Sequence, residues 1–224
     1  MTAPATLLAV HIGRIARLDN AGRGGRGLNT AFVKTPVTGA IAVDGLGLTG
    51  DEQGNLRFHG GVEKAVYGYP VSGYAGWRAD FPDMADCFGQ GALGENLVIE
   101  GQDEATMCIG DVIRCGTATL QIAQNREPCS TLAAVFGTAR VVRAMTRSGR
   151  CGWYYRVLEP GTVAAGDAHI VIDRLNPGWS VARFAAFAAG RSGTRDAISE
   201  LTSLPGLTLA WKRKAAQALA RQRD

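Results

Sequence analysis

Cys129 is the side chain whose sequence surroundings are best suited to chemistry. It lies in QNREPCSTL (residues 124–132), between a strand-like run and a helix-like one. Proline disfavours a helical conformation for the residue before it, and the Ser-Thr pair after Cys129 can cap a following helix. We therefore expect Cys129 at or next to a helix N-terminus, with Arg126 three residues earlier. A helix N-terminus and a nearby cation both favour the thiolate form of cysteine.

A thiolate at Cys129 is compatible with two chemistries. It can act as a nucleophile, with His59 as its base, or as a soft ligand for a metal ion. The sequence offers no second cysteine or histidine at metal-ligand spacing, so a metal would have to arrive largely coordinated by something else. The other cysteines are predicted to be small buried hydrophobic side chains: Cys87, Cys108, Cys115 and Cys151.

His59 belongs to a second candidate motif, in RFHGGVEKAVYGYP (residues 57–70). A lone histidine is more often structural than functional, but Gly60 and Gly61 lack the side chains that would bury the imidazole in a core. Two glycines also let the backbone approach a ligand closely and turn with positive φ. A histidine donor beside exposed backbone N–H groups suits a phosphate or an electron-rich heterocycle.

Two further glycine-containing motifs carry weaker signals. Asn96 follows a glycine turn in GALGENLVIEG (residues 91–101), where it either caps its own turn or recognises a heterocycle through its amide, and the sequence favours neither. GRGGRG at 22–27 fits G-x-G-x-x-G, but the extended, β-branched residues after it do not suit the helix of a dinucleotide-binding fold. We interpret it as a flexible loop that carries arginine.

The elements that must position these residues are mostly short strands. Strand-like segments between glycine turns are found at 6–18, 39–45, 95–101, 111–116, 118–124, 153–161 and 168–174. Helical spacing occurs over 72–81, with Ser72 as a candidate cap, and over 130–142. Many short strands with few long helices predict a mainly β fold, a β-barrel or sandwich with helical insertions.

The strand pattern ends near Pro177. Beyond it the sequence predicts three short helices, at about 180–189, 194–203 and 207–222. We therefore predict two domains, a β domain over 1–176 and a small helical appendage over 177–224.

Composition narrows the class of protein. The chain has 224 residues, 46% of them hydrophobic and 20% charged, which suits a buried core. Its net charge of +4 arises entirely after Trp211, so the neutral body does not favour nucleic-acid binding. No signal peptide or membrane span is expected, and five cysteines without a CxxC pair are typical of a reducing cytoplasm.

Taken together, these segments resemble the MOSC domain family, named for the C-terminal domain of molybdenum-cofactor sulfurase, and more closely its bacterial YiiM-like branch. The matching segments are TAFVKTPVTGAI, GLTGDEQGNLRFHGGVEKAVYGYP, GENLVIEG, IGDVIRCGTATLQIAQNREPC and GWYYRVLEPGTVAAGD. The combination of HGG, GENL and the cysteine of PC is specific. Residues 177–224 resemble the three-helix module that follows the MOSC domain in this branch.

The resemblance implies a β-barrel that binds the molybdenum cofactor, a pyranopterin whose dithiolene supplies two sulfurs to molybdenum. Cys129 matches the family's cysteine, which supplies a third sulfur. Thr30 and Lys34 fall in the cofactor-contacting N-terminal segment, where Lys34 would pair with the phosphate as a point charge. The remaining cofactor-side motifs imply contacts from His59, Gly60, Gly61, Asn96 and Arg126.

The resemblance also implies a reductase that converts N-hydroxylated compounds, including hydroxylaminopurine base analogues, from N–OH to N–H. Electrons are expected from a separate reductase, because the sequence has neither a flavin motif nor cluster-binding cysteine spacing. The basic last helix is either a docking surface for that partner or a solvated face. The oligomeric state stays open, a homodimer included.

Two other functions remain as alternatives. One is a cofactor carrier or sulfur-handling module without turnover. The other is a metal-free thiol hydrolase that uses Cys129 with His59, although no acid adjoins either residue to orient it. The pair after HGG-x is Glu63-Lys64 where the family has Asp-Arg, so no role in proton delivery is assigned to Glu63.

Overall fold

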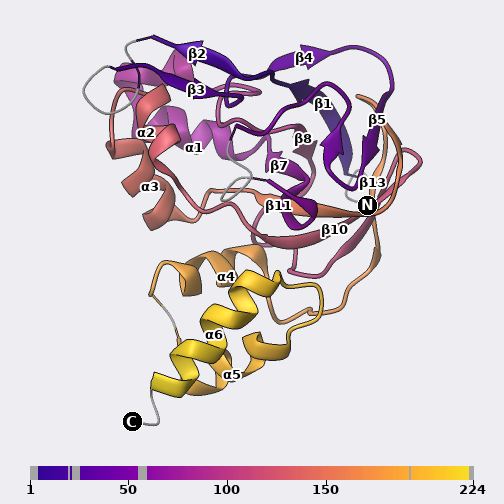
Figure 1. Cartoon of the computed structure of the whole chain (residues 1–224), viewed down its shortest axis with the longest axis vertical. Helices are drawn as coiled ribbons and strands as arrows, with labels where there is room; N and C mark the ends of the chain where they lie inside the picture. Colours follow the sequence, from indigo (N-terminus) through magenta and orange to yellow (C-terminus); the bar gives the residue numbers. More distant parts are fainter. Residues whose placement is uncertain (1–4, 20, 22–25, 55–59, 192, 222–224) are drawn as a thin grey trace.

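An eight-stranded mixed sheet forms the body of the molecule (Figure 1). The computed structural model describes residues 5–19, 21, 26–54, 60–191 and 193–221. The strand order is β13 (His169–Asp173), β9 (Val112–Cys115), β10 (Ala118–Asn125), β11 (Trp153–Glu159), β7 (Val66–Pro70), β8 (Leu97–Glu100), β1 (Thr6–Ile12) and β4 (Thr35–Val37). All neighbours are antiparallel except β7 and β8.

Two small sheets accompany the large one. The first joins β12 (Gly161–Val163), β5 (Ile41–Asp44) and β6 (Gly47–Leu48), and the second joins β2 (Ala16–Leu18) and β3 (Leu28–Thr30). Each of the segments predicted as strands contains at least one strand, so the mainly β prediction is confirmed. Strand β7 was not among them, because its glycine and proline are depleted from strands in general.

The closed barrel expected from the sequence is not confirmed. The strand order has two ends, β13 and β4, so the large sheet is open. Strand β4 contains Pro36, which has no backbone N–H and therefore suits an edge. In the described part of the chain, the start of β1 meets the start of β13 at an isolated bridge between Thr6 and Ala168, with flanking backbone hydrogen bonds. Alternation along strands does not specify closure, because an open curved sheet uses the same pattern.

Helices flank the sheet at one side in the middle of the chain. They are α1 (Gly73–Asp80), α2 (Ser130–Val135) and α3 (Arg140–Ser148), with 3-10 turns η2 (Val62–Lys64) and η3 (Pro82–Cys87). The single helix predicted over 130–142 is wrong, because the chain is broken into α2 and α3 around Gly137, whose φ is 66°. None of the helices in the described ranges has both the length and the apolar character needed to cross a bilayer.

Three helices complete the chain below the sheet in Figure 1: α4 (Val181–Ala188), α5 (Arg195–Ser203) and α6 (Leu209–Arg221). They lie within two residues of the predicted ranges. Their buried side chains, Phe184, Leu201 and Trp211 among them, belong to the same hydrophobic cluster as residues of the sheet. The proposed boundary between 176 and 177 stays a prediction.

Candidate functional site

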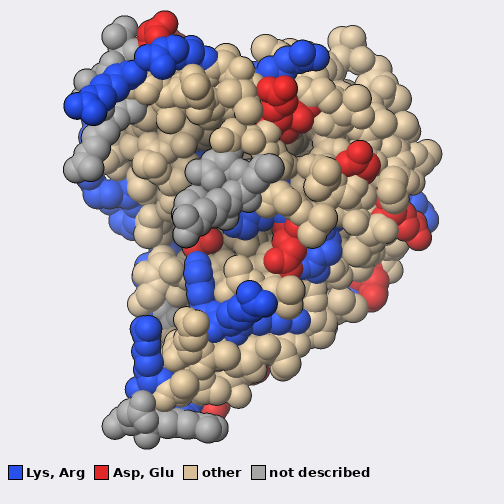
Figure 2. Space-filling model, viewed as in Figure 1, with Lys and Arg blue, Asp and Glu red and all other residues tan. Residues whose placement is uncertain are grey.

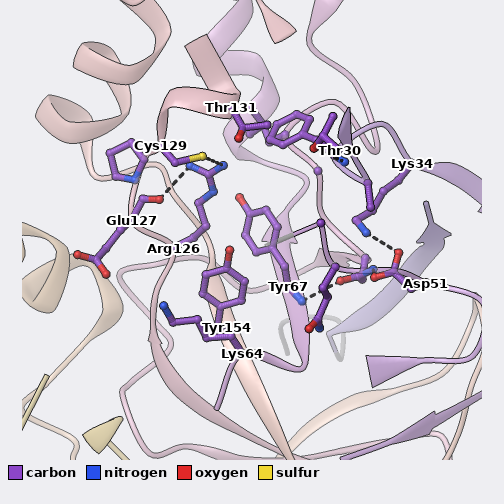
Figure 3. Close-up of a pocket in the computed structure, with 18 of the residues that line it drawn as sticks. Thr30, Lys34, Asp51, Lys64, Tyr67, Arg126, Glu127, Cys129, Thr131 and Tyr154 are labelled. Carbon is purple, nitrogen blue, oxygen red and sulfur yellow. Dashed lines mark hydrogen bonds and ion pairs between the residues drawn. The ribbon is translucent and has the colours of Figure 1, made fainter. Parts of the chain in front are cut away.

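A cavity of about 820 Å³ brings together segments that are far apart in the sequence. Its lining residues come from within 28–34, 51–54, 64–67, 93–96, 124–131 and 210–214, together with Tyr154. Strand β10 ends at Asn125 beside the cavity, and the loop after it places Arg126 and Cys129 on the wall. Figure 3 shows this pair on one side of the cavity, with Lys34 and Asp51 on the other and Tyr67 between them.

Cys129 lies half-buried at the position that precedes α2, with an extended backbone. Arg126 Nη2 donates to its Sγ across 3.5 Å. A guanidinium this close stabilises a thiolate by charge and by hydrogen bonding. The predicted proximity of Arg126 and Cys129 is therefore confirmed. Helix α2 has only six residues, so its dipole adds little to the effect of the arginine.

Arg126 is a buried cation, with 3% of its surface exposed. Its Nη1 donates to the carbonyl oxygen of Glu127, and its guanidinium lies about 6 Å from the rings of Phe32 and Tyr67. Burial lowers the pKa of Arg126, but the neighbouring Cys129 and tyrosines outweigh burial, so the net pKa is above its ordinary value. Arg126 therefore keeps its charge in the protein interior. Its Nε is buried and has no hydrogen-bond partner among the described residues.

Lys34 is tied to the protein on the opposite wall. Its Nζ lies 2.5 Å from Asp51 Oδ1, and the two side chains are 7% and 6% exposed. Asp51 also accepts hydrogen bonds from the backbone N–H of Gly13 and from Asn96 Nδ2. A phosphate contact of Lys34 stays a prediction, and it would have to be shared with Asp51.

Asn96 has its side-chain amide engaged within the protein. Its Oδ1 accepts from the backbone N–H of Tyr67, and its Nδ2 donates to the carbonyl of His11 and to Asp51. These bonds join β1, β7 and the Lys34–Asp51 pair behind the cavity wall. Asn96 lies at the cavity, but its amide supports the wall structurally. Recognition of a heterocycle by Asn96 stays a prediction.

The remaining predicted residues are placed differently. Thr30 lines the cavity, and its Oγ1 accepts from the backbone N–H of Phe32. His59 lies outside the described residues. Gly60 and Gly61 are not among the lining residues, although Gly61 adopts φ 80° and its carbonyl accepts from the backbone N–H of Lys64. The glycine turn thus sets the position of Lys64, which does line the cavity.

Several lining residues were not predicted from the sequence. Strand β11 presents Tyr154, half-buried between fully buried neighbours, and burial raises the pKa of its phenol. Helix α6 presents Trp211 and Lys214, three residues apart and hence on one helix face. Alternation and helical spacing indicate shared faces, but only the packing of α6 against the sheet brings Trp211 and Lys214 to the cavity.

Glu63 connects the glycine turn to α6. Its carboxylate accepts from the backbone N–H of Leu209, the first residue of α6, at 3.0 and 3.3 Å. Arg156 Nη2 lies 3.2 Å from Glu63, and its Nη1 donates to the carbonyl of Gly206 just before the helix. Glu63 is therefore an N-terminal cap supplied from 146 residues away.

Comparison with known proteins identifies the family of this chain. The family model described as MOSC domain matches residues 55–169. Protein YiiM of Escherichia coli strain K12 is 35% identical over 187 residues, which cover 84% of this chain and 83% of that one. A protein of Gibberella moniliformis named Reductase is 34% identical over 90% of this chain, but the match covers 35% of its length. The chain thus spans about a third of that relative.

Solved structures are similar across the whole chain. The crystal structure of YiiM from Geobacillus stearothermophilus has a TM-score of 0.79 at 26% identity and covers 96% of this chain and 100% of that one. The crystal structure of YiiM from Escherichia coli has a TM-score of 0.77 at 27% identity, over 99% and 94% of the two chains. The chain therefore belongs to the MOSC domain family, as a YiiM-like member.

Proposed function

We propose that this protein is a molybdenum-cofactor-dependent reductase of N-hydroxylated compounds such as hydroxylaminopurines. The net conversion consumes two electrons and two protons, turns N–OH into N–H and releases water. The observation that carries the proposal is the pairing of a half-buried thiol, Cys129, with a buried guanidinium, Arg126, on the wall of a large cavity. Membership of the MOSC domain family supports it.

The residues at the cavity fit such a cofactor. Within the described ranges, no three His, Cys, Asp or Glu side chains converge as a metal-ligand group. A metal held at Cys129 would therefore bring most of its ligands with it, as a dithiolene-bound molybdenum does. A volume of about 820 Å³ is in the range of cofactor sites. The buried, unpaired Nε of Arg126 offers a further donor to an anionic ligand.

When bound, the cofactor would supply the two-electron oxygen-transfer chemistry. The chain's own residues would hold and orient it. Cys129 would provide one thiolate, and Arg126 would keep that sulfur ionised and fix its direction through the 3.5 Å contact. Thr30, Lys34 and Asn96 would form the opposite wall.

The electron donor in this proposal is a separate protein, and the reaction takes place in the cytoplasm. The relative named Reductase carries its matching region in a much longer chain, which supports a reductive role for this fold. The exposed basic side chains of α6 outside the cavity, such as Arg213, are candidate contacts for an acidic donor.

The molybdenum content of Cys129→Ala against wild type tests the proposal. Both proteins are made in a host that synthesises the cofactor, with Cys87→Ala as control. The predicted burial of Cys87 is wrong, because Cys87 is exposed, and it does not line the cavity. We expect about one molybdenum per chain in wild type and control, loss in Cys129→Ala, and turnover of a hydroxylaminopurine with a chemical electron donor. Wild type without molybdenum would overturn the proposal. Molybdenum without turnover would favour the carrier function.

A further inference from the structure

Helix α6 closes one side of the cavity. Ala210, Trp211 and Lys214 on this helix are lining residues, alongside Lys64 from the turn after Gly61. Figure 2 shows Lys and Arg side chains gathered over α6 on the face of the molecule in view. Helix α6 therefore contributes directly to the site.

Lys64 and Lys214 are held at the cavity by one set of contacts. Glu63, the neighbour of Lys64, caps α6 through Leu209 and is itself bound by Arg156. Because Glu63 and Lys64 are adjacent, the segment that positions one lysine also fixes the helix that carries the other. Two cations from distant parts of the sequence are thereby kept together at the mouth of the cavity.

The charges at this mouth are unbalanced. Asp51 is engaged by Lys34 on the far wall, and Glu52 accepts from the backbone N–H of Ile15. Among the described lining residues, this leaves Glu127, 3.3 Å from Lys214, as the carboxylate near the two lysines. The other carboxylate near Lys64 is Glu63, which Arg156 binds, so the three cations Lys64, Lys214 and Arg156 outnumber the two carboxylates.

Aromatic rings support both lysines. Lys214 Nζ lies 4.1 Å from the ring centroid of Trp211, and Lys64 Nζ lies 5.9 Å from that of Tyr154. Burial lowers the pKa of Lys64, with nearby Lys214 acting in the same direction and Glu127 and Glu63 opposing them. A bound anion would relieve the repulsion between the ammonium groups. Two lysines suit a dianionic phosphate, to which each contributes a point charge.

We propose that Lys64 and Lys214 form a phosphate subsite at the mouth of the cavity, so that the preferred substrate is an N-hydroxylated base in its nucleotide form. The assignment of the N-hydroxylated base as the reacting end of this substrate rests on the proposed function. The same chemistry would suit the phosphate of the cofactor, and the two sources are distinguishable by experiment.

The first test measures binding without turnover. Isothermal titration calorimetry of the full chain compares adenosine 5′-monophosphate with adenosine for wild type, Lys214→Gln, Lys64→Gln and the control Lys212→Gln. Lys212 lies on the same helix and is not a lining residue. We expect the monophosphate to bind at least about ten-fold more tightly than adenosine to wild type and control, and this preference to be lost in the other two variants. Equal affinities in wild type would overturn the subsite.

The second test identifies the source of the phosphate. Molybdenum content and steady-state kinetics are measured with a hydroxylaminopurine and with its nucleoside monophosphate. We expect Lys214→Gln to raise KM about ten-fold for the monophosphate only, with kcat and molybdenum content unchanged, and Lys214→Arg to restore KM. Loss of molybdenum in the lysine variants would assign the phosphate to the cofactor and overturn the substrate assignment. Absence of wild-type turnover would refute the proposed function, while the binding test would still decide the subsite.

Discussion

Two regions of the sheet bury ionisable side chains with opposite results: the cavity around Arg126 and the core around Cys115 and His169. At the cavity, Arg126 is 3% exposed yet its pKa is raised, because the thiol and phenols around it outweigh desolvation. In the core, burial raises the pKa of Cys115 to about 12 and lowers that of His169 to about 4. The first region keeps a charge and the second keeps its groups neutral.

The difference shows that burial alone does not decide the charge of a side chain. His169 contacts Gln102 Oε1 through Nδ1 and the Tyr155 hydroxyl through Nε2. An amide oxygen accepts and a phenol donates, so both ring nitrogens are satisfied in the neutral form. Arg126 faces a thiol that can ionise. The partner supplied by the fold therefore determines whether a buried group is available for chemistry.

The largest expected effect is in thiol reactivity. In native protein at pH 7, we expect iodoacetamide to modify Cys129 and the exposed Cys87. It should modify Cys115 and Cys151 at least about a thousand-fold more slowly. The thiolate is the reactive form, and burial raises the pKa of both core thiols. Peptide mass spectrometry gives the rates, and modification of all cysteines in denaturant is the control. Equal alkylation rates for Cys129 and Cys115 in native protein would contradict the proposed difference in thiol ionisation between the cavity and the core.

Burial of His169 in the core should make the stability of the protein depend on pH. The folded pKa of His169, about 4, lies below its unfolded value near 6.5, so the unfolded chain binds the extra proton first as pH falls. Wild type should lose about 3 kcal/mol of unfolding free energy through His169 between pH 6.5 and 4.

The variant His169→Gln isolates this effect. Its unfolding free energy, from urea denaturation across the same pH range, should lack the His169 contribution. Glu95 and Glu104, whose pKa values burial raises, act in the opposite direction in both proteins and cancel in the comparison. Parallel pH profiles for variant and wild type would show that folding does not lower the pKa of His169.

A smaller effect tests the cation at the cavity. Arg126→Met keeps side-chain length but removes the charge beside Cys129, and should lower its thiolate fraction, and so its alkylation rate at pH 7, about ten-fold. Arg150→Met is the matched control, because Arg150 lies over Trp77 and pairs with Asp80 outside this cavity. An unchanged alkylation rate in Arg126→Met would mean that Arg126 does not increase the thiolate fraction of Cys129.

The smallest effect concerns the link between the cavity and α6. Glu63→Ala removes the cap on Leu209 and the pair with Arg156, and should lower the unfolding free energy by about 1 kcal/mol. Glu63→Gln keeps an acceptor and should lose about half as much. Thermal and urea denaturation measure both, with the exposed Glu100→Ala as control. An unchanged unfolding free energy in Glu63→Ala would show that the contact between Glu63 and Leu209 does not stabilise the protein.

Local patterns in the sequence predicted much of the fold and part of the site. Short alternating segments predicted the strands. The predicted caps are wrong, because Ser72 makes no capping hydrogen bond to α1 and Cys129, not Ser130 or Thr131, occupies the position before α2. Cys129 and Arg126 were predicted to be neighbours because they are only three positions apart in the sequence. The break at Gly137 was missed, because helical spacing continues across it in the sequence.

The sequence by itself therefore determined the mainly β character, the C-terminal helices and the thiol–guanidinium pair, all of which depend on residues close together in the chain. Only the tertiary structure decided that the sheet is open, that Asn96 and Asp51 support the wall, and that Glu63 caps a helix 146 residues later. It also brought Trp211 and Lys214 to the cavity. These features depend on contacts between distant segments, and such contacts leave no periodic pattern in a single sequence.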